Sequence, residues 1–528
     1  MVALPLMEQR SAKWWWYFPW SSLAFWGMAL CFFLMAYGHH SVFFKPKSIH
    51  AWRQADSASQ FRMYYQEDIS FWTPRWHSFN NGNDNIATSE FPVTYFVSSR
   101  LARWFGYSEA WSRGLHFFLF VLGLFYLFRL GRLLLSNPLW AWFPPLFYLL
   151  SPACFYYANN YLPNMPAISL ALIGWYFMYR YRLEPSWRHL GLWAGLFTLA
   201  ALIKPSEGLH MVVALAFLSW EYLGAGRPPG VARPWGRLLT ALAFFVLVFG
   251  SWVYYVWHDG NNVSLLGILP LWEGARADNA YTWQVLRELW MPALASWPLW
   301  LATALALLAL LFHRRGYLFR RPSGDLASVG DWELFRPWRV TMLMLGASAA
   351  YFLLWFQAFR MHDYYLLTLT VAPAFVWLSF FRVYEIWFNR GRRVWILLAV
   401  LLGLLVSSAY HNRQVQAFRN WEYGDDYTTP ALRTIEPQLR EMGIPRTAKV
   451  VIAPDPSPNI SLYMANNPGW NAELHGGVND LRTFQSMGAE YFILKDSSLL
   501  DKPGMRAYLG EPIGKVEEIA VYRLDVAE

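Results

Sequence analysis

The chain has 528 residues, of which 56% are hydrophobic and only 15% are charged, whereas a typical soluble protein is about 25% charged. A water-soluble protein of this composition would aggregate, so the composition predicts a membrane protein. The formal net charge of +9 comes from basic residues in short loops between apolar segments, where they act as topology signals, and this argues against nucleic-acid binding.

Taken in chain order, eleven apolar segments approach the length of about 20 residues that crosses a bilayer. The sequence therefore predicts a polytopic α-helical membrane protein with about eleven transmembrane helices within residues 1–410. A long polar loop, residues 39–113, separates the first span from the second. The eleven segments are residues 20–38, 114–134, 138–156, 165–181, 188–203, 207–224, 237–257, 294–312, 339–357, 365–387 and 394–410.

The loops between these spans alternate in charge. Six of them collect basic residues, for example Arg180, Arg182 and Arg188, and the intervening loops are poorer in Arg. By the positive-inside rule the basic set faces the cytoplasm. We therefore expect a cytoplasmic N-terminus, with the 39–113 loop and the C-terminal segment on the outer side.

After Tyr410 the composition becomes that of a small soluble domain, with 12 Lys and Arg against 16 Asp and Glu in residues 411–528. Helical and strand patterns alternate there, which predicts an α/β domain with a partly parallel sheet. It has no glycine-rich phosphate-binding motif, so we expect a supporting or acceptor-binding role. The expected elements are a helix over residues 430–442 with Thr429 as its N-cap, a helix over 481–487, and strands over 449–453, 491–494 and 519–524.

Asp56 is the first candidate catalytic residue, within the sequence Trp-Arg-Gln-Ala-Asp-Ser-Ala of residues 52–58. A carboxylate at the mouth of a helical bundle is a candidate general base. The alternative is a structural acid that caps a helix or pairs with Arg53. Residues 51–66 have the composition of a helix at the membrane surface, with these aromatic anchors: Trp52, Phe61, Tyr64 and Tyr65.

Glu90 is the second acidic candidate in the loop. Pro92 stops the preceding helix and can open the next, so Glu90 is expected in a turn close to a helix N-terminus. A carboxylate there is a candidate ligand for a divalent cation, with His258 or His362 as partners. The alternative is a cap carboxylate stabilised by the helix dipole.

A third candidate region is Arg-Met-His-Asp-Tyr-Tyr, residues 360–365, at the outer end of two spans. Ionisable groups at a membrane boundary are costly unless they are used. Arg360 and His362 are candidates to neutralise a phosphate, and Tyr364 and Tyr365 are candidates to donate hydrogen bonds to it. The alternative is an interfacial aromatic belt with an outward-pointing Arg.

Two further outward turns carry polar side chains. Lys204 is the only Lys between Lys47 and Lys449, and an ammonium at that depth suits a lipid phosphate; alternatively it pairs with Glu207 and caps a helical hairpin. Asn160 and Asn164 lie in an amide-rich turn that suits sugar hydroxyls, or serves only as turn chemistry.

Other functional classes are less consistent with the chain. It has no nucleotide-binding loop, zinc-type His pair or nucleophile elbow, which argues against an ATP-driven pump. Its spans carry almost no acids, unlike those of ion-coupled transporters. The candidate residues converge on the outward face, which favours chemistry at the outer membrane surface.

One cytoplasmic N-terminus, one span, a long outward loop with an acid and a many-span bundle resemble the GT-C glycosyltransferases over roughly residues 20–390. Within them, the chain looks like the branch of protein O-mannosyltransferases and the lipid A aminoarabinose transferase. This resemblance implies transfer of a sugar from a polyprenyl (undecaprenyl) phosphate carrier to an acceptor glycan, lipid or protein. The reaction would invert the anomeric centre at the outer face of the bacterial inner membrane.

The resemblance also implies residue roles. Asp56 falls where the family has its first-loop catalytic acid, the general base. Glu90-Phe91-Pro92 resembles the family turn Glu-Lys-Pro-Pro, in which Glu binds a metal ion and Lys binds the carrier phosphate. Residues 360–365 fall where the family contacts the donor phosphate.

The chain departs from this pattern at two places, because Ser57 follows Asp56 instead of Glu and Phe91 replaces the phosphate-binding Lys. Phosphate binding is then expected from other residues: Arg53, Lys204, Arg360, His362, Tyr364 and Tyr365. Substrate positioning is expected from Glu90, Asn160, Asn164 and His258, with a divalent metal ion at Glu90 as an additional cofactor. The alternatives are a polymerase or flippase of lipid-linked glycans, or a non-enzymatic envelope assembly protein.

Overall fold

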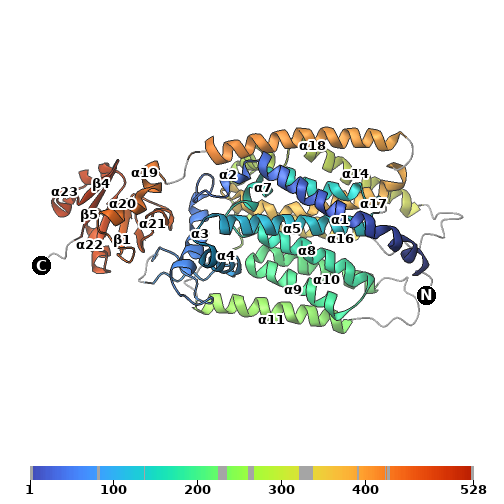
Figure 1. Ribbon diagram of the computed structural model, residues 1–528, viewed down its shortest axis with the longest axis horizontal. Helices are drawn as coiled ribbons and strands as arrows, with labels where there is room; N and C mark the ends of the chain where they lie inside the picture. The colour runs from blue at the N-terminus through green and yellow to red at the C-terminus, as the bar shows by residue number, and fades with distance from the viewer. Residues whose placement is uncertain are drawn as a thin grey trace.

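The structure is a computed structural model, and it describes residues 4–79, 84–135, 137–223, 235–259, 267–319, 337–388, 392–422, 424 and 428–524. Long helices lie side by side along the long axis of the molecule, and a small sheet-containing domain sits at one end (Figure 1). Helix α1 begins at the opposite end (Figure 1).

Each of the eleven apolar segments is helical over most of its described length. A helix satisfies its own backbone hydrogen bonds, which a chain in lipid requires. The bundle helices are α1 (Leu4–Met35), α5 (Ala110–Leu134), α6 (Phe143–Leu150), α7 (Pro152–Ala158), α8 (Asn164–Leu183), α9 (Trp187–Ile203), α10 (Gly208–Leu223), α11 (Trp235–Asp259), α14 (Trp297–Phe319), α16 (Pro337–Leu354), α17 (Val371–Phe388) and α18 (Arg393–Ala417).

Length and hydropathy alone identify fewer spans than eleven. Four helical segments of the described chain are long and apolar enough to cross a membrane: Ala110–Leu134, Trp235–His258, Asp363–Tyr384 and Arg393–Glu422. A fifth counts if Arg276–Leu294 and Trp297–Phe312, bent by 91°, form one broken span. The expected number of about eleven spans therefore remains a prediction, although the expected helices are present.

Small residues bring the central helices together. A Cβ atom at Gly123 of α5 would lie 2.7 Å from Cα of Ser169 in α8. Close backbone approach of this kind is typical of helix pairs in membranes. Around this contact the bundle interior is filled with aromatic and aliphatic side chains, including Trp140, Trp175 and Phe375, each at most 1% exposed.

The long polar loop is helical in part. It contains α2 (Gly38–Ser41), α3 (Ala51–Gln66) and α4 (Val93–Phe105). Helix α3 has the expected bounds, but two of its expected membrane anchors, Phe61 and Tyr64, are fully buried against protein. The interpretation of these two residues as interfacial anchors was wrong, because they pack against Tyr95 and the rest of the loop.

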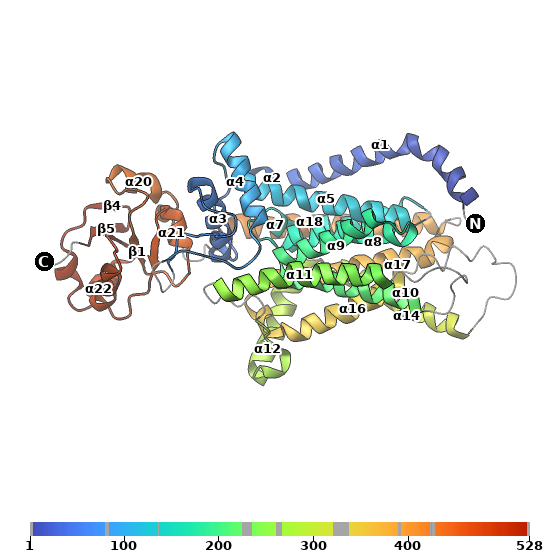
Figure 2. The same cartoon turned by 90° about the horizontal axis from the view of Figure 1, so that it is seen from below.

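Two short helices, α12 (Arg276–Val285) and α13 (Met291–Leu294), lie between α11 and α14 in the chain. The 3₁₀ segments η6 (Phe356–Arg360) and η7 (Asp363–Thr370) precede α17. Figure 2 shows α12 projecting from the side of the bundle. The last bundle helix, α18, continues beyond Tyr410 to Ala417, and one further turn, η8 (Phe418–Glu422), follows it.

The C-terminal domain is the expected small α/β unit. Its five-stranded sheet has the order β2-β1-β3-β5-β4, with β1 parallel to β2 and β3, and β5 antiparallel to β3 and β4. Thr429 accepts a hydrogen bond from the Leu432 amide as the expected N-cap, although the helix breaks at Thr434. The elements are α19 (Pro430–Arg433), α20 (Ile435–Glu441), β1 (Val450–Ala453), α21 (Ile460–Ala465), β2 (Gly469–Asn471), α22 (Val478–Ser486), β3 (Tyr491–Leu494), η9 (Ser497–Asp501), α23 (Met505–Leu509), β4 (Gly514–Val516) and β5 (Ile519–Arg523).

The loop and the C-terminal domain are joined by main-chain and side-chain bonds. The Phe79 amide donates to the Gly469 carbonyl at 2.8 Å, and the Gly469 amide donates to the His77 carbonyl at 3.0 Å. These bonds cover the edge strand β2, which would otherwise expose unpaired backbone groups. The Nη2 atom of Arg62 in α3 also donates to both carboxylate oxygens of Glu436, at 2.7 and 2.8 Å.

Candidate functional site

Four segments meet at the end of the bundle that faces the C-terminal domain. They are the N-terminal half of α3, the turn before α4, the end of α9 with the 3₁₀ segment η2 (Pro205–Glu207), and η7. Together they bring Arg53, Asp56, Glu90 and Lys204 into one group, which we call the Asp56 cluster. These residues are up to about 150 positions apart in sequence, so tertiary packing alone assembles them.

Glu90 is the fixed centre of the Asp56 cluster. Arg53 donates to its Oε2 at 2.7 Å and Lys204 donates to its Oε1 at 3.0 Å, while the Tyr95 hydroxyl lies 3.4 Å from Oε2. Burial alone would raise the pKa of Glu90, but Arg53 and Lys204 outweigh it and lower the pKa to about 2. Glu90 is therefore ionised at neutral pH, and it acts as a clamp on two cations rather than as a helix cap.

Asp56 has a different environment from Glu90. Its closest ionic partner, Arg53, is 3.7 Å away and is already committed to Glu90. Among the described residues, Oδ1 of Asp56 is buried and has no hydrogen-bond partner. Burial raises the pKa of Asp56 to about 7, with the Arg53 charge opposing the rise and the Glu90 charge adding to it. Asp56 therefore exchanges a proton near neutral pH.

Aromatic rings and a histidine form one wall beside the cluster. The Lys204 ammonium lies 5.1 Å from the centre of the Tyr365 ring. His362 stacks on Tyr364 at 5.2 Å and lies 5.8 Å from Trp52. Burial, together with nearby His50, lowers the pKa of His362 to about 4, so this ring is neutral at pH 7. It can donate or accept a hydrogen bond, but it does not supply the positive charge that the sequence suggested.

A second group, the Asp363 cluster, lies next to this wall. Asp363 is 1% exposed, and it accepts hydrogen bonds from His50 at 3.1 Å, from Arg419 at 2.7 Å and from the Tyr157 hydroxyl. Both carboxylate oxygens are thus used. Because its partners come from the first loop, from α7 and from the turn after α18, this cluster ties three distant parts of the chain together.

The remaining expected phosphate and substrate contacts divide into two groups. Asn164 donates to the Tyr364 carbonyl at 3.2 Å and so supports the wall from behind. Arg360 instead pairs with Asp278 of α12 at 3.0 Å on the surface. His258 is exposed and stacks on Tyr254. Asn160 is fully buried, and its side-chain oxygen accepts the amides of its own turn. The described contacts of these last three residues lie outside the Asp56 cluster.

Lys204 does not form the hairpin-capping pair with Glu207 that was the alternative interpretation, because it binds Glu90 instead. Glu207 is fully buried, pairs with His210 at 2.9 Å and accepts a hydrogen bond from Thr368 at 2.6 Å. Glu207, expected from the sequence only as a partner of Lys204, is instead a buried acid paired with His210 inside the bundle.

A divalent cation does not fit the side chains around Glu90. Both oxygens of this carboxylate already bind cations, which would repel a metal ion. The described residues include no group of three His, Cys, Asp or Glu side chains arranged to hold one, and neither His258 nor His362 contacts Glu90. Metal dependence therefore remains a prediction from the resemblance.

An apolar groove opens beside the wall of tyrosines. It has a volume of about 750 Å³ and is lined by α12, α13, α14, α16, η7 and α17. Leu366 and Leu369 of η7 line the groove, and η7 also carries Tyr364. One short segment therefore contributes both to the polar wall and to the groove. Other lining residues are Trp283, Leu294, Trp297 and Trp300.

Sequence reasoning missed the groups that complete the site. Asp363 lay inside a recognised motif but was given no role. Arg419 was assigned to the soluble domain because it follows the last apolar stretch, whereas it lies in η8 at the end of the bundle. Tyr157 and His50 had no motif around them. The unusual density of Tyr and His at outward helix ends was the only available signal.

No protein-family model and no curated protein matches this sequence. Solved structures do match. ArnT from Cupriavidus metallidurans, bound to undecaprenyl phosphate, is 13% identical with a TM-score of 0.59, over 96% of this chain and 98% of that chain. The arabinofuranosyltransferase AftD from Mycobacteria is 14% identical with a TM-score of 0.55, over 95% of this chain and 40% of AftD.

The archaeal oligosaccharyltransferase AglB from Archaeoglobus fulgidus, in complex with an inhibitory peptide and a dolichol-phosphate, is 12% identical with a TM-score of 0.52, over 92% of this chain and 71% of that chain. All three are GT-C glycosyltransferases. At this level of identity the likeness is one of fold. The chain thus has the GT-C fold, as the resemblance in its sequence predicted.

Proposed function

We propose that this protein is a membrane glycosyltransferase that moves a sugar from a polyprenyl phosphate carrier to an acceptor hydroxyl, with Asp56 as the general base. The observation that carries the proposal is the contrast within the Asp56 cluster. Glu90 is locked between Arg53 and Lys204, while Asp56 has a free oxygen and a pKa of about 7. Pairs of acids whose pKa values are driven apart by their environments are typical of acid–base sites.

Asp56 suits a base at neutral pH. A catalytic base works best when its pKa is near the working pH, and burial raises the pKa of Asp56 to about 7. Its unpartnered Oδ1 is a hydrogen-bond acceptor that lacks a donor. The hydroxyl group of the molecule that receives the sugar can donate the hydrogen bond that this oxygen lacks.

Lys204 and Arg53 are the proposed phosphate ligands. An ammonium has three donors and a guanidinium has five, so each retains donors after binding Glu90. Tyr364 and Tyr365 line the adjacent wall and add hydroxyl donors. Because Arg360 is paired with Asp278 at the surface, we leave it out of the proposed phosphate site.

The polyprenyl tail is assigned to the apolar groove. The tail is a long hydrocarbon chain, and the groove is apolar and borders the segment that carries the tyrosines. ArnT, which shares the fold, has been solved with undecaprenyl phosphate. We therefore extend a carrier of this class to the present chain.

The chemical step is a single displacement. The acceptor oxygen forms a bond to the anomeric carbon as its proton passes to Asp56, and the bond from that carbon to the phosphate oxygen breaks. The phosphate leaves with the bonding electrons, and Lys204 and Arg53 stabilise its growing negative charge. Attack from the face opposite the leaving group inverts the anomeric centre. The positive-inside pattern supports the outer face of the membrane for this step, with the N-terminus in the cytoplasm, and the resemblance to GT-C glycosyltransferases implies a bacterial inner membrane.

Turnover of defined donors tests this activity. Purified full-length protein in lipid nanodiscs would receive radiolabelled undecaprenyl-phosphate sugars and a mixed pool of cell-envelope glycans, lipids and proteins, with and without a chelator. The proposal expects label to move to one acceptor class as a single sugar, with release of undecaprenyl phosphate. Formation of a polymer, or no transfer of label to any acceptor, would contradict it.

A further inference from the structure

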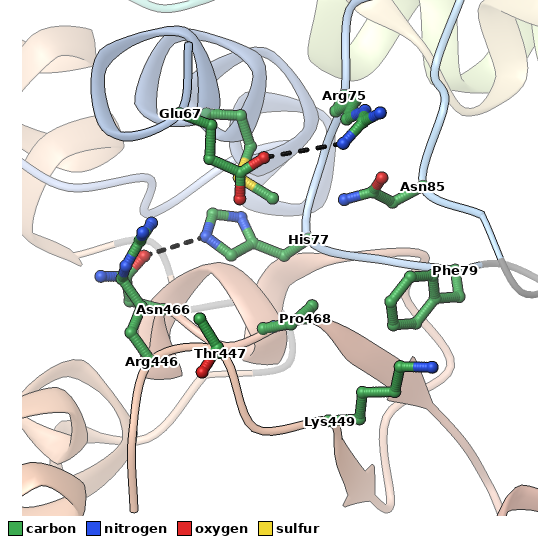
Figure 3. A pocket seen from close by; sticks show the side chains of 11 residues that line it. Glu67, Arg75, His77, Phe79, Asn85, Arg446, Thr447, Lys449, Asn466 and Pro468 are labelled. Carbon is green, nitrogen blue, oxygen red and sulfur yellow. Dashed lines mark hydrogen bonds and ion pairs between the residues drawn. The ribbon is translucent and has the colours of Figure 1, made fainter. Parts of the chain in front are cut away.

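A second polar cavity lies away from the Asp56 cluster, where the first loop meets the C-terminal domain. It is an open cleft of about 250 Å³ (Figure 3). The C-terminal half of α3, residues 75–79 and Asn85 form one side, and residues 446–449 and 466–468 form the other. Both the loop and the C-terminal domain must therefore be in place for the cleft to exist.

The cleft is basic. Its charged side chains are Arg75, Arg446, Lys449 and Glu67, three cations against one carboxylate. The Arg75–Glu67 pair is 3.9 Å long and partly exposed, so it is weak and replaceable. Arg446 donates to Gln66 at 2.8 Å, and within the described residues neither Arg446 nor Lys449 forms an ion pair with a carboxylate. This positive charge is notable in a C-terminal domain that carries more acids than bases.

His77, at the back of the cleft, is neutral and fixed. It bonds Ser59 at 2.6 Å and Asn466 at 3.0 Å, and its pKa is lowered to about 3 by burial, with Arg62 nearby. The imidazole therefore holds the loop against the C-terminal domain. Among the described residues that line the cleft, the positive charge available to a ligand comes from Arg75, Arg446 and Lys449.

The chemistry of the cleft favours a sugar over a peptide. Acidic peptides are often recognised as an added strand at a sheet edge, but residues 77–79 already occupy the neighbouring edge of β2. The other polar groups are the exposed Thr447 hydroxyl and the side-chain amide of Asn85, whose Nδ2 already donates to the Trp76 carbonyl at 2.9 Å. Hydroxyl and amide groups suit the hydroxyl groups of a sugar. Arg and Lys suit carboxylate or phosphate substituents.

We propose that this cleft binds an anionic saccharide, as a subsite for part of the acceptor beyond the hydroxyl that reacts. The assignment to an acceptor rests on the proposed function. Met63 in the cleft is seven residues after Asp56 on α3, so the two lie on the same helix face, about 10 Å apart along the axis. An acceptor that extends beyond one sugar unit spans this distance.

Binding measurements test the cleft independently of turnover. Full-length protein in nanodiscs would be titrated with fluorescent oligogalacturonate, with a phosphorylated oligosaccharide, with a neutral oligosaccharide and with oligoglutamate. The cleft variant is Arg446→Gln with Lys449→Gln. The matched control is Arg506→Gln with Lys515→Gln, which removes two exposed charges elsewhere in the same domain. A Lys449→Arg variant checks that charge, and not a change in folding, is responsible.

The proposal expects an anionic saccharide to bind, and expects the cleft variant to weaken it at least about tenfold, as for the loss of one charge-assisted hydrogen bond or more. The control and Lys449→Arg should bind as the wild type does. Preference for carboxylated or phosphorylated sugar identifies the source of the charge. Equal binding of the neutral sugar, equal binding of oligoglutamate, or an unaffected cleft variant would overturn the proposal.

The two proposals fail separately. Asp56→Asn should abolish transfer but leave saccharide binding intact, while the cleft variant should keep binding of undecaprenyl phosphate. Normal turnover by Asp56→Asn would contradict the proposed mechanism and leave the cleft assignment standing. Loss of saccharide binding in Asp56→Asn would instead show that the measured ligand occupies the Asp56 cluster and not the cleft.

Discussion

The Asp56 cluster and the Asp363 cluster are two buried groups of acids and cations at the same end of the bundle, and they differ in how completely their oxygens are used. Asp363 has partners on both oxygens, whereas Oδ1 of Asp56 has none among the described residues. A satisfied buried network makes a structure rigid, while an unsatisfied buried group requires an explanation. The comparison supports the proposal that the Asp56 cluster takes part in the reaction, while the Asp363 cluster holds distant parts of the chain together.

The cations of the two clusters differ less clearly than the acids. Arg419 is enclosed by Asp363, Tyr156 and Tyr157. Lys204 and Arg53 share one carboxylate, Glu90, and retain donors for a ligand. Proximity of acids and bases is therefore not sufficient to identify a site at this end of the molecule. Arg419 also keeps a buried Nη1 atom without a hydrogen-bond partner among the described residues, so the property that distinguishes the Asp56 cluster is its unpartnered carboxylate oxygen.

The largest expected effect follows from removing the base. Asp56→Asn keeps the size of the side chain, but its amide cannot take the proton from the hydroxyl that attacks the sugar. The transfer rate should therefore fall by about 10²–10⁴. Folding and undecaprenyl phosphate affinity should be unchanged, because the cations remain bound to Glu90. Rates with a radiolabelled donor measure this, with Asp278→Asn at the surface as the matched control. Near-normal turnover would remove Asp56 from the mechanism.

Asp363→Asn should act on stability instead. It leaves the buried Arg419 guanidinium without its carboxylate, and breaking a buried pair costs about 3–5 kcal/mol. The thermal midpoint in detergent should fall, while protein that remains folded at low temperature should retain its pH dependence of transfer. A stable variant with a lowered transfer rate would show that the Asp363 cluster also takes part in the chemistry.

Glu90→Gln should shift the pH dependence. The negative charge of Glu90 raises the pKa of Asp56, and its removal also frees Arg53 to approach Asp56. Both changes favour the ionised form of Asp56, so the rising limb of activity should move to lower pH. A shift to higher pH, or no shift, would contradict the electrostatic coupling of the two acids.

The smallest effects concern donor binding. Lys204→Ala should weaken binding of undecaprenyl phosphate about tenfold, because one charge-assisted contact is lost. Arg360→Ala removes a cation whose partner is Asp278 at the surface, and affinity should not change. Titration in nanodiscs measures both. Equal weakening by the two variants would place the phosphate nearer to α12 than proposed.

Much of the fold could be predicted from the sequence because its signals are local. Apolar length and alternating loop charge predicted the helices, and α3 begins and ends at the expected residues. The surface position of Phe61 and Tyr64 was predicted wrongly, because an aromatic helix face looks the same whether it meets lipid or protein. The bend of 91° between the helical segments Arg276–Leu294 and Trp297–Phe312 was also not predicted.

The candidate site could be predicted only in part. Asp56, Glu90, Lys204 and Tyr364 were identified by their positions at outward helix ends. The pairing of Glu90 with Lys204 joins residues 114 positions apart, and no local pattern encodes it. The role of Arg419 was missed for the same reason, since its partner lies 56 positions away.

The pH dependence of a single round of transfer tests the central claim most directly. Asp56 has a pKa raised to about 7, so below that pH it is protonated and cannot accept a proton, and above it the base is available. We expect the rate of the wild type to rise with pH through a midpoint near 7, and this limb to disappear in Asp56→Asn. A rate independent of pH between about 5 and 9, or a midpoint near the ordinary aspartate pKa of about 4, would contradict the assignment of Asp56 as the base.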